Sequence, residues 1–317
     1  MLKGPLRVLG VVPRSDRSCR LAAMITDGTS VSDVYDGMDF DVPSGGSGLV
    51  DAIAAAVLAY VGGAERFDLL AIDGIGVDGD ALSLATRTTV AWNLNEADLR
   101  FGGLGGPWLG FFDHALCRQS ELAGVAACVD LGAVTHLAMI DVGAETPDDG
   151  GVMIEMDTGP GVGSGPSAGD TGAINEEVVA SLMDDPFYLG LAPRRAPQEG
   201  FVAFEAELAA LEDPDAVATR RAAIAMSLAD GLESAPALPD YIILGGEGAA
   251  DTSLVEMIGA VTGIDVVTMD DLGVNSADHA ALSVAFAGAR MSTGLPTSSP
   301  AATGVAAAVA GGTISRP

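Results

Sequence analysis

The order of predicted elements repeats along this chain, and it constrains the fold more than any other feature of the sequence. Each half begins with three apolar runs separated by short polar turns, which predicts a meander of strands. The meander runs are residues 6–12, 20–26 and 30–36 in the first half, and 126–132, 135–142 and 151–156 in the second. Helical and strand-like runs then alternate. This order, found twice, predicts a duplicated α/β fold of two lobes with a cleft between them.

The alternating runs complete each lobe. They are residues 49–61, 68–74, 88–94 and 108–116 in the first half, and 175–183, 200–211, 215–234, 240–245, 252–262, 265–269 and 276–291 in the second. We expect an N-terminal lobe of residues 1–125 and a C-terminal lobe of residues 126–284. A C-terminal segment of about 285–317 is expected to pack on the N-terminal lobe. A chain of 317 residues is long enough for two such lobes.

The charge balance excludes two classes of partner. The formal net charge is −29, and Lys3 is the one lysine in the sequence. Such a field repels nucleic acid and anionic membranes. The acidic residues are dispersed along the chain, which favours the cytosolic protein of a halophile over an acidic interaction protein, because dispersed charge keeps a protein soluble in high salt.

Neither a membrane segment nor a disulfide framework is predicted. The sequence has no continuous apolar run of about 18 residues, and residues 1–5 lack a signal-peptide pattern. The three cysteines, Cys19, Cys117 and Cys128, have no paired spacing. These features fit the reducing cytoplasm. Aromatic residues are only 5% of the chain while 49% is hydrophobic, so the core is expected to consist of small side chains.

The run Asp157-Thr158-Gly159-Pro160-Gly161 carries the most specific chemical signal. An apolar run at residues 151–156 leads into it, which predicts a strand that ends in a carboxylate and then turns. A carboxylate beside free backbone N–H groups suits the deprotonation of a hydroxyl next to a phosphate. The alternative is an Asx-type turn that only closes the strand.

Three further predicted strands have a glycine at or near their end and then turn. These turns lie after Gly10 at residues 12–18, at residues 130–135, and in the run Gly245-Gly246-Glu247-Gly248. Glycines let backbone amides approach a phosphate closely, although any one of these turns is also explained as a tight turn. Walker and Gly-x-Gly-x-x-Gly patterns are missing, which disfavours P-loop and Rossmann folds.

The histidines give no nucleophile–base pair in the sequence. His114 lies in an apolar helical run and is interpreted as a core or cap residue. His136 follows the second glycine turn, where a turn role is favoured over a phosphate-site role. His279 opens a predicted helix and is expected at the surface.

Two motifs give the chain a resemblance to a known family. Gly102-Gly103-Leu104-Gly105-Gly106-Pro107 is similar to the family's Gly-Gly-Gln-Gly-Ala-Pro, and residues 157–161 are similar to its Asp-Thr-Gly-Pro-Gly-Asn. Asp184-Asp185-Pro186-Phe187-Tyr188 and residues 244–248 support the match. The chain resembles the anhydro-N-acetylmuramic acid kinases of the actin/hexokinase/Hsp70-like ATPase superfamily.

The resemblance implies a fold, a reaction and a set of site residues. The fold is a duplicated ribonuclease H-like, two-lobed fold, and the ligands are ATP with Mg²⁺ and a small sugar. The family opens a 1,6-anhydro ring with water while it phosphorylates the sugar, and Asp157 would be the base that activates the water. The implied nucleotide-binding residues are Arg14, Ser15, Asp16, Gly132, Thr135, Gly159, Gly161, Gly245, Gly246 and Gly248. The implied sugar-binding residues are Asp98, Gly103 and Gly105. No metal ligand is assigned, and a homodimer is left open.

The sequence departs from the family at the first phosphate loop. The family's Met-Ser-Gly-Thr-Ser-x-Asp-Gly corresponds to residues 12–19, where both glycines are replaced and Pro13 removes a backbone donor. Arg14 and Arg17 supply charge there instead. Likewise, Asp73 and Asp130 stand where the family has a histidine and an asparagine. Three hypotheses therefore stay open: a sugar kinase with a same or altered substrate, a non-catalytic relative that binds a nucleotide or metabolite, and a structural or regulatory partner protein.

Overall fold

The computed structural model describes residues 4–15, 17–43, 48–61, 66–74, 76–106, 108–163 and 172–317. The chain divides into two compact units, which are described separately. The first unit comprises residues 1–123, 142–152 and 278–317. The second comprises residues 124–141 and 153–277.

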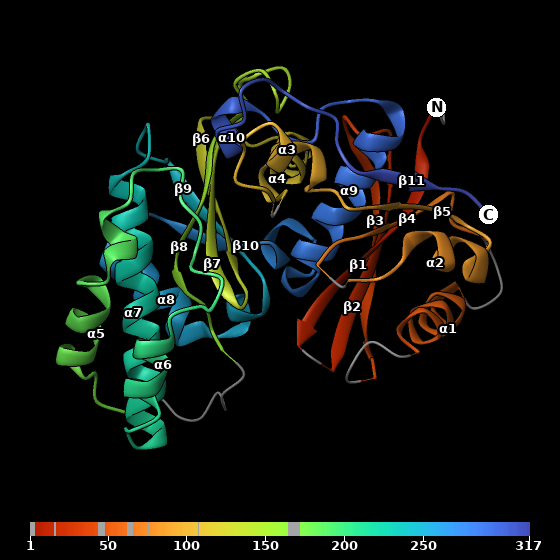
Figure 1. Ribbon diagram of the computed structural model, residues 1–317. Coiled ribbons are helices and arrows are strands. Elements are labelled where there is room, and N and C mark those ends of the chain that lie inside the picture. The colour runs from red at the N-terminus through yellow and green to blue at the C-terminus, as the bar shows by residue number, and fades with distance from the viewer. Residues whose placement is uncertain are drawn as a thin grey trace. The chain divides into compact units, whose positions relative to one another are not determined.

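The first unit contains a mixed sheet, which has six strands in the described part of the chain, in the order β11-β5-β4-β1-β2-β3 (Figure 1). The strands are β1 (Leu6–Ser15), β2 (Ser18–Thr26), β3 (Val31–Asp41), β4 (Leu69–Ile72), β5 (Thr89–Trp92) and β11 (Thr313–Ser315). β1, β2 and β3 form the predicted antiparallel meander, and β4 and β5 continue parallel to β1. β11 closes the edge antiparallel to β5.

Helices cover both faces of this sheet. They are α1 (Leu49–Val61), α2 (Gly79–Thr86), α3 (Glu96–Arg100), α4 (Leu109–Gln119), α9 (His279–Thr293) and α10 (Pro300–Thr303). Leu9 and Val11 are two residues apart on β1, so their side chains point to the same face of the sheet. They pack with Ile53 and Val57 of α1 in one apolar core. Figure 1 shows α1 and α2 on one face of the sheet and α9 on the other.

The second unit repeats the same strand order. Within the described residues its sheet runs β10-β9-β6-β7-β8. The strands are β6 (Val125–Leu131), β7 (Val134–Asp141), β8 (Val152–Pro160), β9 (Tyr241–Gly245) and β10 (Val266–Thr268). β6 and β7 are antiparallel, whereas β9 is parallel to β6 and β10 to β9. Numbered within its own unit, each sheet therefore contains the order 5-4-1-2-3, and this confirms the predicted duplicated α/β fold.

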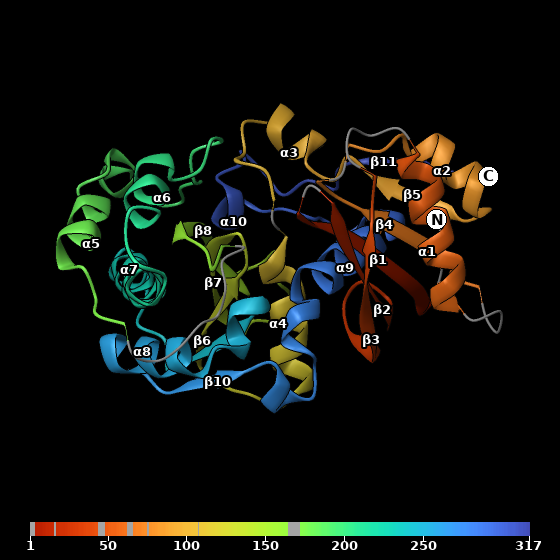
Figure 2. The ribbon, with the colours of Figure 1, turned by 90° about the horizontal axis from the view of Figure 1, so that it is seen from below.

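Helices α7 (Asp213–Glu233) and α8 (Thr252–Thr262) of the second unit pack on one face of its sheet and form an apolar core with it. The other helical elements are α5 (Glu176–Met183), η1 (Pro186–Leu189), α6 (Val202–Leu208), η2 (Glu247–Ala250), η3 (Asp270–Leu272) and η4 (Ser276–Asp278). Val129, Leu137 and Met156 pack with Leu228 of α7 and Ile258 of α8 in one core. Figure 2 shows α7 nearly end-on beside this sheet.

Three predicted strand ends are wrong, and one of them is that of β3, which continues to Asp41 and not to residue 36. β8 continues through Pro160, so Asp157 lies inside the strand and not in a turn after it. The extension is stabilised by β7, because the Thr135 hydroxyl donates to the Pro160 carbonyl at 2.7 Å and the Thr158 hydroxyl donates to the Thr135 carbonyl at 3.3 Å. β1 likewise continues to Ser15, where it pairs with Ser18 of β2, so residues of the expected phosphate loop lie within these two strands.

Other findings concern helices and cysteines. α2, α3 and β11 were not predicted from the sequence. The three cysteines are buried, and none of them forms a disulfide bond. In the part of the chain that the structure describes, no helix combines the length and the apolar character that a bilayer crossing requires.

Candidate active site

Asp157 is held at both of its carboxylate oxygens. Nδ1 of His136, on the neighbouring strand β7, lies 2.8 Å from Oδ1. The backbone N–H of Ala196 donates to Oδ2 at 2.7 Å. The Asp157 side chain is 13% exposed, so it is largely enclosed and still reachable from solvent.

The segment that supplies the Ala196 amide is itself anchored. The backbone N–H of Asp157 donates to the Arg194 carbonyl at 2.9 Å, so residues 194–196 run beside β8. The buried Arg194 guanidinium lies over the rings of Phe187 and Tyr188, at 4.7 and 5.4 Å, and pairs with Asp230. These contacts of Arg194 hold the segment in place, and with it Ala196, whose backbone amide binds Asp157.

The environment keeps the Asp157 carboxyl ionised. Burial alone would raise its pKa, but the His136 hydrogen bond, the Arg195 charge 4.0 Å away and the Ala196 amide outweigh burial and lower the pKa below its ordinary value. A general base must be deprotonated before it can take a proton, and Asp157 meets this condition at neutral pH.

Asp157 is one member of a row of polar side chains across the sheet. Asp130 of β6 is paired with His136 of β7 in the strand register, and Gly245 of β9 is paired with Asp130. Paired residues of neighbouring antiparallel strands point to the same face. We call Asp130, His136 and Asp157 the polar row. It lies on the face opposite to the core formed with α7 and α8.

The predicted glycine turns of the second unit meet at the β6–β7 turn. A Cβ atom at Gly161 would overlap the Gly132 carbonyl oxygen, so only glycine allows this approach. Gly246 has a φ of 79°, and its missing Cβ faces Leu131 N and Asp130 Oδ1 at 2.7 and 2.8 Å. Two segments that are far apart in sequence, those of Gly161 and Gly246, are thereby packed around one hairpin turn.

The other nucleotide-assigned residues of this unit lie on strands or in the short helix η2. Gly245 is the last residue of β9, and Gly248 lies in η2 against Leu131. Thr135 is buried and uses its hydroxyl within the sheet. Gly159 packs against Ser227 of α7.

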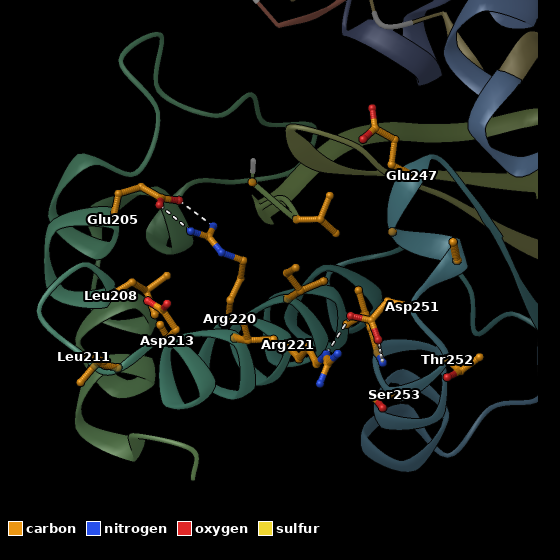
Figure 3. A pocket seen from close by; sticks show the side chains of 18 of the residues that line it. Glu205, Leu208, Leu211, Asp213, Arg220, Arg221, Glu247, Asp251, Thr252 and Ser253 are labelled. Carbon is orange, nitrogen blue, oxygen red and sulfur yellow. Dashed lines mark hydrogen bonds and ion pairs between the residues drawn. The ribbon is translucent and has the colours of Figure 1, made fainter. Parts of the chain in front are cut away.

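A cavity of about 720 Å³ opens beside these turns, within the second unit (Figure 3). Its apolar lining includes Leu208, Ile224 and Leu254, and Gly248 lines it from the glycine turns. Figure 3 shows Arg220 of α7 reaching across toward Glu205 of α6. Its guanidinium binds both Glu205 carboxylate oxygens, at 2.7 and 2.6 Å, and the Gly161 carbonyl at 3.2 Å.

A second arginine pair forms the wall of the cavity. Nε of Arg221 donates to Asp251 Oδ2 at 2.7 Å, and Asp251 also caps helix α8. The volume and the mixture of apolar and polar groups fit a small-molecule site.

In the first unit, Arg14 is paired with an aspartate. Its Nη1 donates to both Asp39 oxygens, and Arg20 binds Asp39 at 3.1 Å and Asp278 at 2.6 Å. The side chain of Ser15, and Asp16 as a whole, lie outside the described residues. The hairpin pairs Pro13 with Cys19.

Asp98 organises the glycine loop that follows α3. It is 1% exposed and accepts hydrogen bonds from the Gly105 amide at 2.7 Å and from the Thr303 hydroxyl at 2.6 Å. Gly103 lies against the same carboxylate. The Asp98 carboxylate therefore determines the shape of residues 102–106, and contact of this loop with a sugar stays a prediction.

A further carboxyl group lies beside this loop and was noted in the sequence only as a departure. Asn95 donates to Asp73 Oδ1 at 3.4 Å and accepts a hydrogen bond from the Gly106 amide. Burial raises the pKa of Asp73 to about 6, against an opposing hydrogen bond from the Gly74 amide. Asp73 follows β4 and Asn95 follows β5, and parallel strands bring such positions together at one edge of a sheet.

Two histidine interpretations have different outcomes. His114 is buried, with Nε2 3.2 Å from the Ala144 carbonyl, as expected for a core residue. His279 is also buried, where a surface position was expected. Its Nε2 lies 2.7 Å from Asp113 Oδ1, and both side chains are fully enclosed.

Metal coordination by the protein alone finds no support. Among the described residues, no group of three His, Cys, Asp or Glu side chains is arranged to hold an ion.

The repeated strand order and the gathered glycine turns define a class of protein, the duplicated ribonuclease H-like proteins of the actin/hexokinase type. Residues 74–317 match the sequence profile of the family described as anhydro-N-acetylmuramic acid kinase, and the chain belongs to this family. The match begins after the β1–β2 hairpin, where the sequence departs most from the family.

Curated relatives agree with the profile. The chain is 30% identical to anhydro-N-acetylmuramic acid kinase 1 of Jannaschia sp. (strain CCS1) over 255 residues, which cover 76% of this chain and 68% of the relative. It is 31% identical to the kinase of Cereibacter sphaeroides over 254 residues, covering 75% and 68%. With the Rhizobium etli kinase it shares 29% identity over 297 residues, covering 83% and 78%.

Proposed function

We propose that this chain is an ATP-dependent sugar kinase that opens an anhydrosugar ring with water and phosphorylates the sugar. The observation that carries the proposal is the environment of Asp157. This carboxylate is ionised, oriented by two donors and partly open to solvent. Family membership gives the reaction class, and anhydro-N-acetylmuramic acid is the substrate to test first.

Asp157 acts as the general base in this proposal. Each of its oxygens keeps a lone pair beyond the one that accepts an internal hydrogen bond. The water proton passes to Asp157 as the water oxygen bonds to the anomeric carbon. The bond from that carbon to the bridging oxygen breaks, and this oxygen bonds to the γ-phosphorus of ATP as the bond between that phosphorus and ADP breaks and ADP leaves. Positioning and charge stabilisation supply most of the acceleration in such a transfer.

We assign the nucleotide to the cavity of the second unit. The 720 Å³ cavity is large enough for a nucleoside, and Gly248 links its lining to the gathered turns. Backbone amides at glycine turns bind phosphate well, and Arg220 is a cation on the wall of the cavity. Mg²⁺ prefers phosphate oxygens and water to an all-protein cage, so in this proposal it enters with the phosphates of ATP.

The first unit contributes the sugar loop and the altered hairpin. We assign sugar contacts to Gly103 and Gly105, with Asp98 holding their loop through the Gly105 amide. Arg14 is assigned to a phosphate in place of the amide cradle that Pro13 prevents. A cytoplasmic location, solubility in high salt and a homodimer belong to the same proposal.

Turnover decides between a kinase and a non-catalytic relative. ADP release is measured with ATP, Mg²⁺ and anhydro-N-acetylmuramic acid in high-salt buffer, followed by a panel of other anhydrosugars. Sugar-dependent ADP release that is lost in Asp157→Asn supports the kinase. ADP release in no mixture, despite ATP binding, contradicts it.

A further inference from the structure

We infer that His136 is a positioning residue that fixes the carboxylate plane of Asp157 through a hydrogen bond donated by its Nδ1. The inference rests on the proposed function only for the role of Asp157 as base. The geometry stands by itself, since His136 is 3% exposed and its Nδ1 lies 2.8 Å from Asp157 Oδ1.

The position of the ring proton of His136 follows from the contacts of its two ring nitrogens. An ionised carboxylate only accepts hydrogen bonds, so Nδ1 of His136 must carry the proton that it donates to Asp157. Nε2 is buried and has no hydrogen-bond partner among the described residues. A proton on Nε2 would leave a buried N–H without an acceptor, and this costs more than a bare lone pair. The ring therefore donates from Nδ1 to Asp157, and this is its one hydrogen bond among the described residues.

The second step concerns the freedom of the carboxylate. The terminal torsion of an aspartate is broad, so packing of the chain alone does not fix the direction of its lone pairs. The His136 donor on Oδ1 and the Ala196 donor on Oδ2 hold the plane from two sides. Without His136, Oδ1 loses its short donor and the plane is held at Oδ2.

The burial of His136 Nε2 without a hydrogen-bond partner among the described residues is energetically unfavourable. β7 is otherwise apolar along the stretch from Leu137 to Ile140, and an aliphatic side chain at position 136 would leave no unsatisfied nitrogen. A buried polar atom without a partner is uncommon and calls for an explanation. The contact with Asp157 supplies one, because it serves the reacting group.

The charged groups around this pair determine what a pH profile reports. Asp157 faces His136 from β8, Arg195 lies 4.0 Å from Asp157, and Asp130 is the register partner of His136 on β6. The buried Glu155 precedes Asp157 by two residues on β8. Substitution of His136 by an uncharged residue leaves these groups unchanged, so a shift in the titration of Asp157 reports the lost donor.

Two substitutions separate the donor from the volume of the side chain. His136→Leu removes the donor and keeps the bulk, whereas His136→Asn keeps an N–H near the Nδ1 position. The ¹³C carboxyl shift of Asp157 is followed against pH in protein labelled at aspartate, with the signal assigned by its loss in Asp157→Asn. In parallel, kcat and KM are measured against pH by ADP release.

We expect His136→Leu to raise the pKa of Asp157 by about one unit, the scale of one charge-assisted hydrogen bond. The acid limb of the kcat profile should move to higher pH by the same amount, with kcat at neutral pH lower by ~10-fold to 100-fold and KM for ATP little changed. His136→Asn should restore the acid limb. An unmoved Asp157 titration in a folded His136→Leu protein overturns the inference.

The assay of ADP release and the titration of the Asp157 carboxyl group test different claims. If no sugar gives turnover, the proposed function fails, while the carboxyl titration still decides the role of His136. If His136→Leu does not fold, His136→Gln takes its place, because its amide lies one methylene further out and cannot occupy the Nδ1 position. A His136→Gln titration equal to that of wild type then overturns the inference.

Discussion

Nη1 of Arg14 donates hydrogen bonds to both carboxylate oxygens of Asp39, at 2.7 and 2.6 Å. Burial alone would raise the pKa of Asp39, but the hydrogen bonds from Arg14 and Arg20 outweigh it and lower the pKa. The charge that the sequence assigns to a phosphate is thus partly neutralised inside the protein. An anion that binds Arg14 competes with Asp39.

This competition predicts opposite changes in ATP affinity when Arg14 and Asp39 are substituted. Arg14→Gln should weaken ATP binding by about 10-fold, because a charge-assisted contact is lost. Asp39→Asn should tighten it by about 3-fold, the scale of an exposed ion pair. Calorimetric titration with MgATP measures both, and Arg100→Gln, on the exposed face of α3, is the control. Wild-type affinity in both variants would leave Arg14 with a purely structural role.

Asp157→Asn should lower kcat by ~10³-fold or more and leave the fold intact. The amide is nearly isosteric but cannot accept a proton from water. ADP release measures kcat, and thermal unfolding checks the fold. Asp33→Asn, at an exposed position of β3, serves as the matched control. Asp157 has no part in the mechanism if its variant turns over like the control.

The sequence predicts the meanders and the helix–strand alternation well, because apolar runs and polar turns are local signals. It fails at Asp157, where Thr158, Gly159 and Pro160 are poor strand residues and predict a turn. Hydrogen bonds to Thr135 of β7 keep this segment extended instead, and such tertiary contacts are not visible in a local pattern. α2 had a visible signal, since the Asp78 side chain caps its first turn.

The candidate site is harder to predict than the fold. Asp157 is found from its motif, but its contact with His136, 21 residues earlier in the chain, depends on the register of β7 and β8. The alternation of β7 offered a clue, because His136 is polar and lies between buried residues. Asp73 and Asn95 meet only because β4 and β5 are parallel neighbours.

The gathered turns predict a sharp contrast between two glycines of the second unit. Gly161→Ala forces a Cβ atom into the Gly132 carbonyl, so unfolding should occur at a lower Tm and ATP binding should be lost. Gly259→Ala lies in α8, where the new Cβ finds its nearest atom at 3.5 Å. It should stabilise the fold by roughly 0.5–1 kcal/mol. Calorimetric scans with and without MgATP compare the two, and equal Tm values would contradict the packing described here.

The cavity predicts a difference between neighbouring alanines. Ala209 lines the cavity, whereas Ala210 does not, and both are exposed. Ala209→Trp should fill part of the cavity and raise the Kd for ATP by about 10-fold or more, because bound ligands lose most of their surface to such pockets. Ala210→Trp should leave the Kd near that of wild type. Equal Kd values in the two variants would move the nucleotide away from this cavity.

The Asp73 carboxyl predicts how stability changes with pH. Its pKa in the folded protein is about 6, above the ~3.9 of an unfolded chain. The folded state therefore binds more protons than the unfolded state between these two values, and its contribution to stability falls as pH rises from about 4 to about 6. Above that window the penalty for an ionised, enclosed carboxylate is complete. Asp73→Asn removes this contribution. The free energy of unfolding of the variant minus that of wild type should therefore increase as pH rises from about 4 to about 6 and stay constant above that range. Denaturant unfolding at pH 4, 5, 6 and 7 gives the difference, and a constant difference across this range would mean that Asp73 titrates alike in both states.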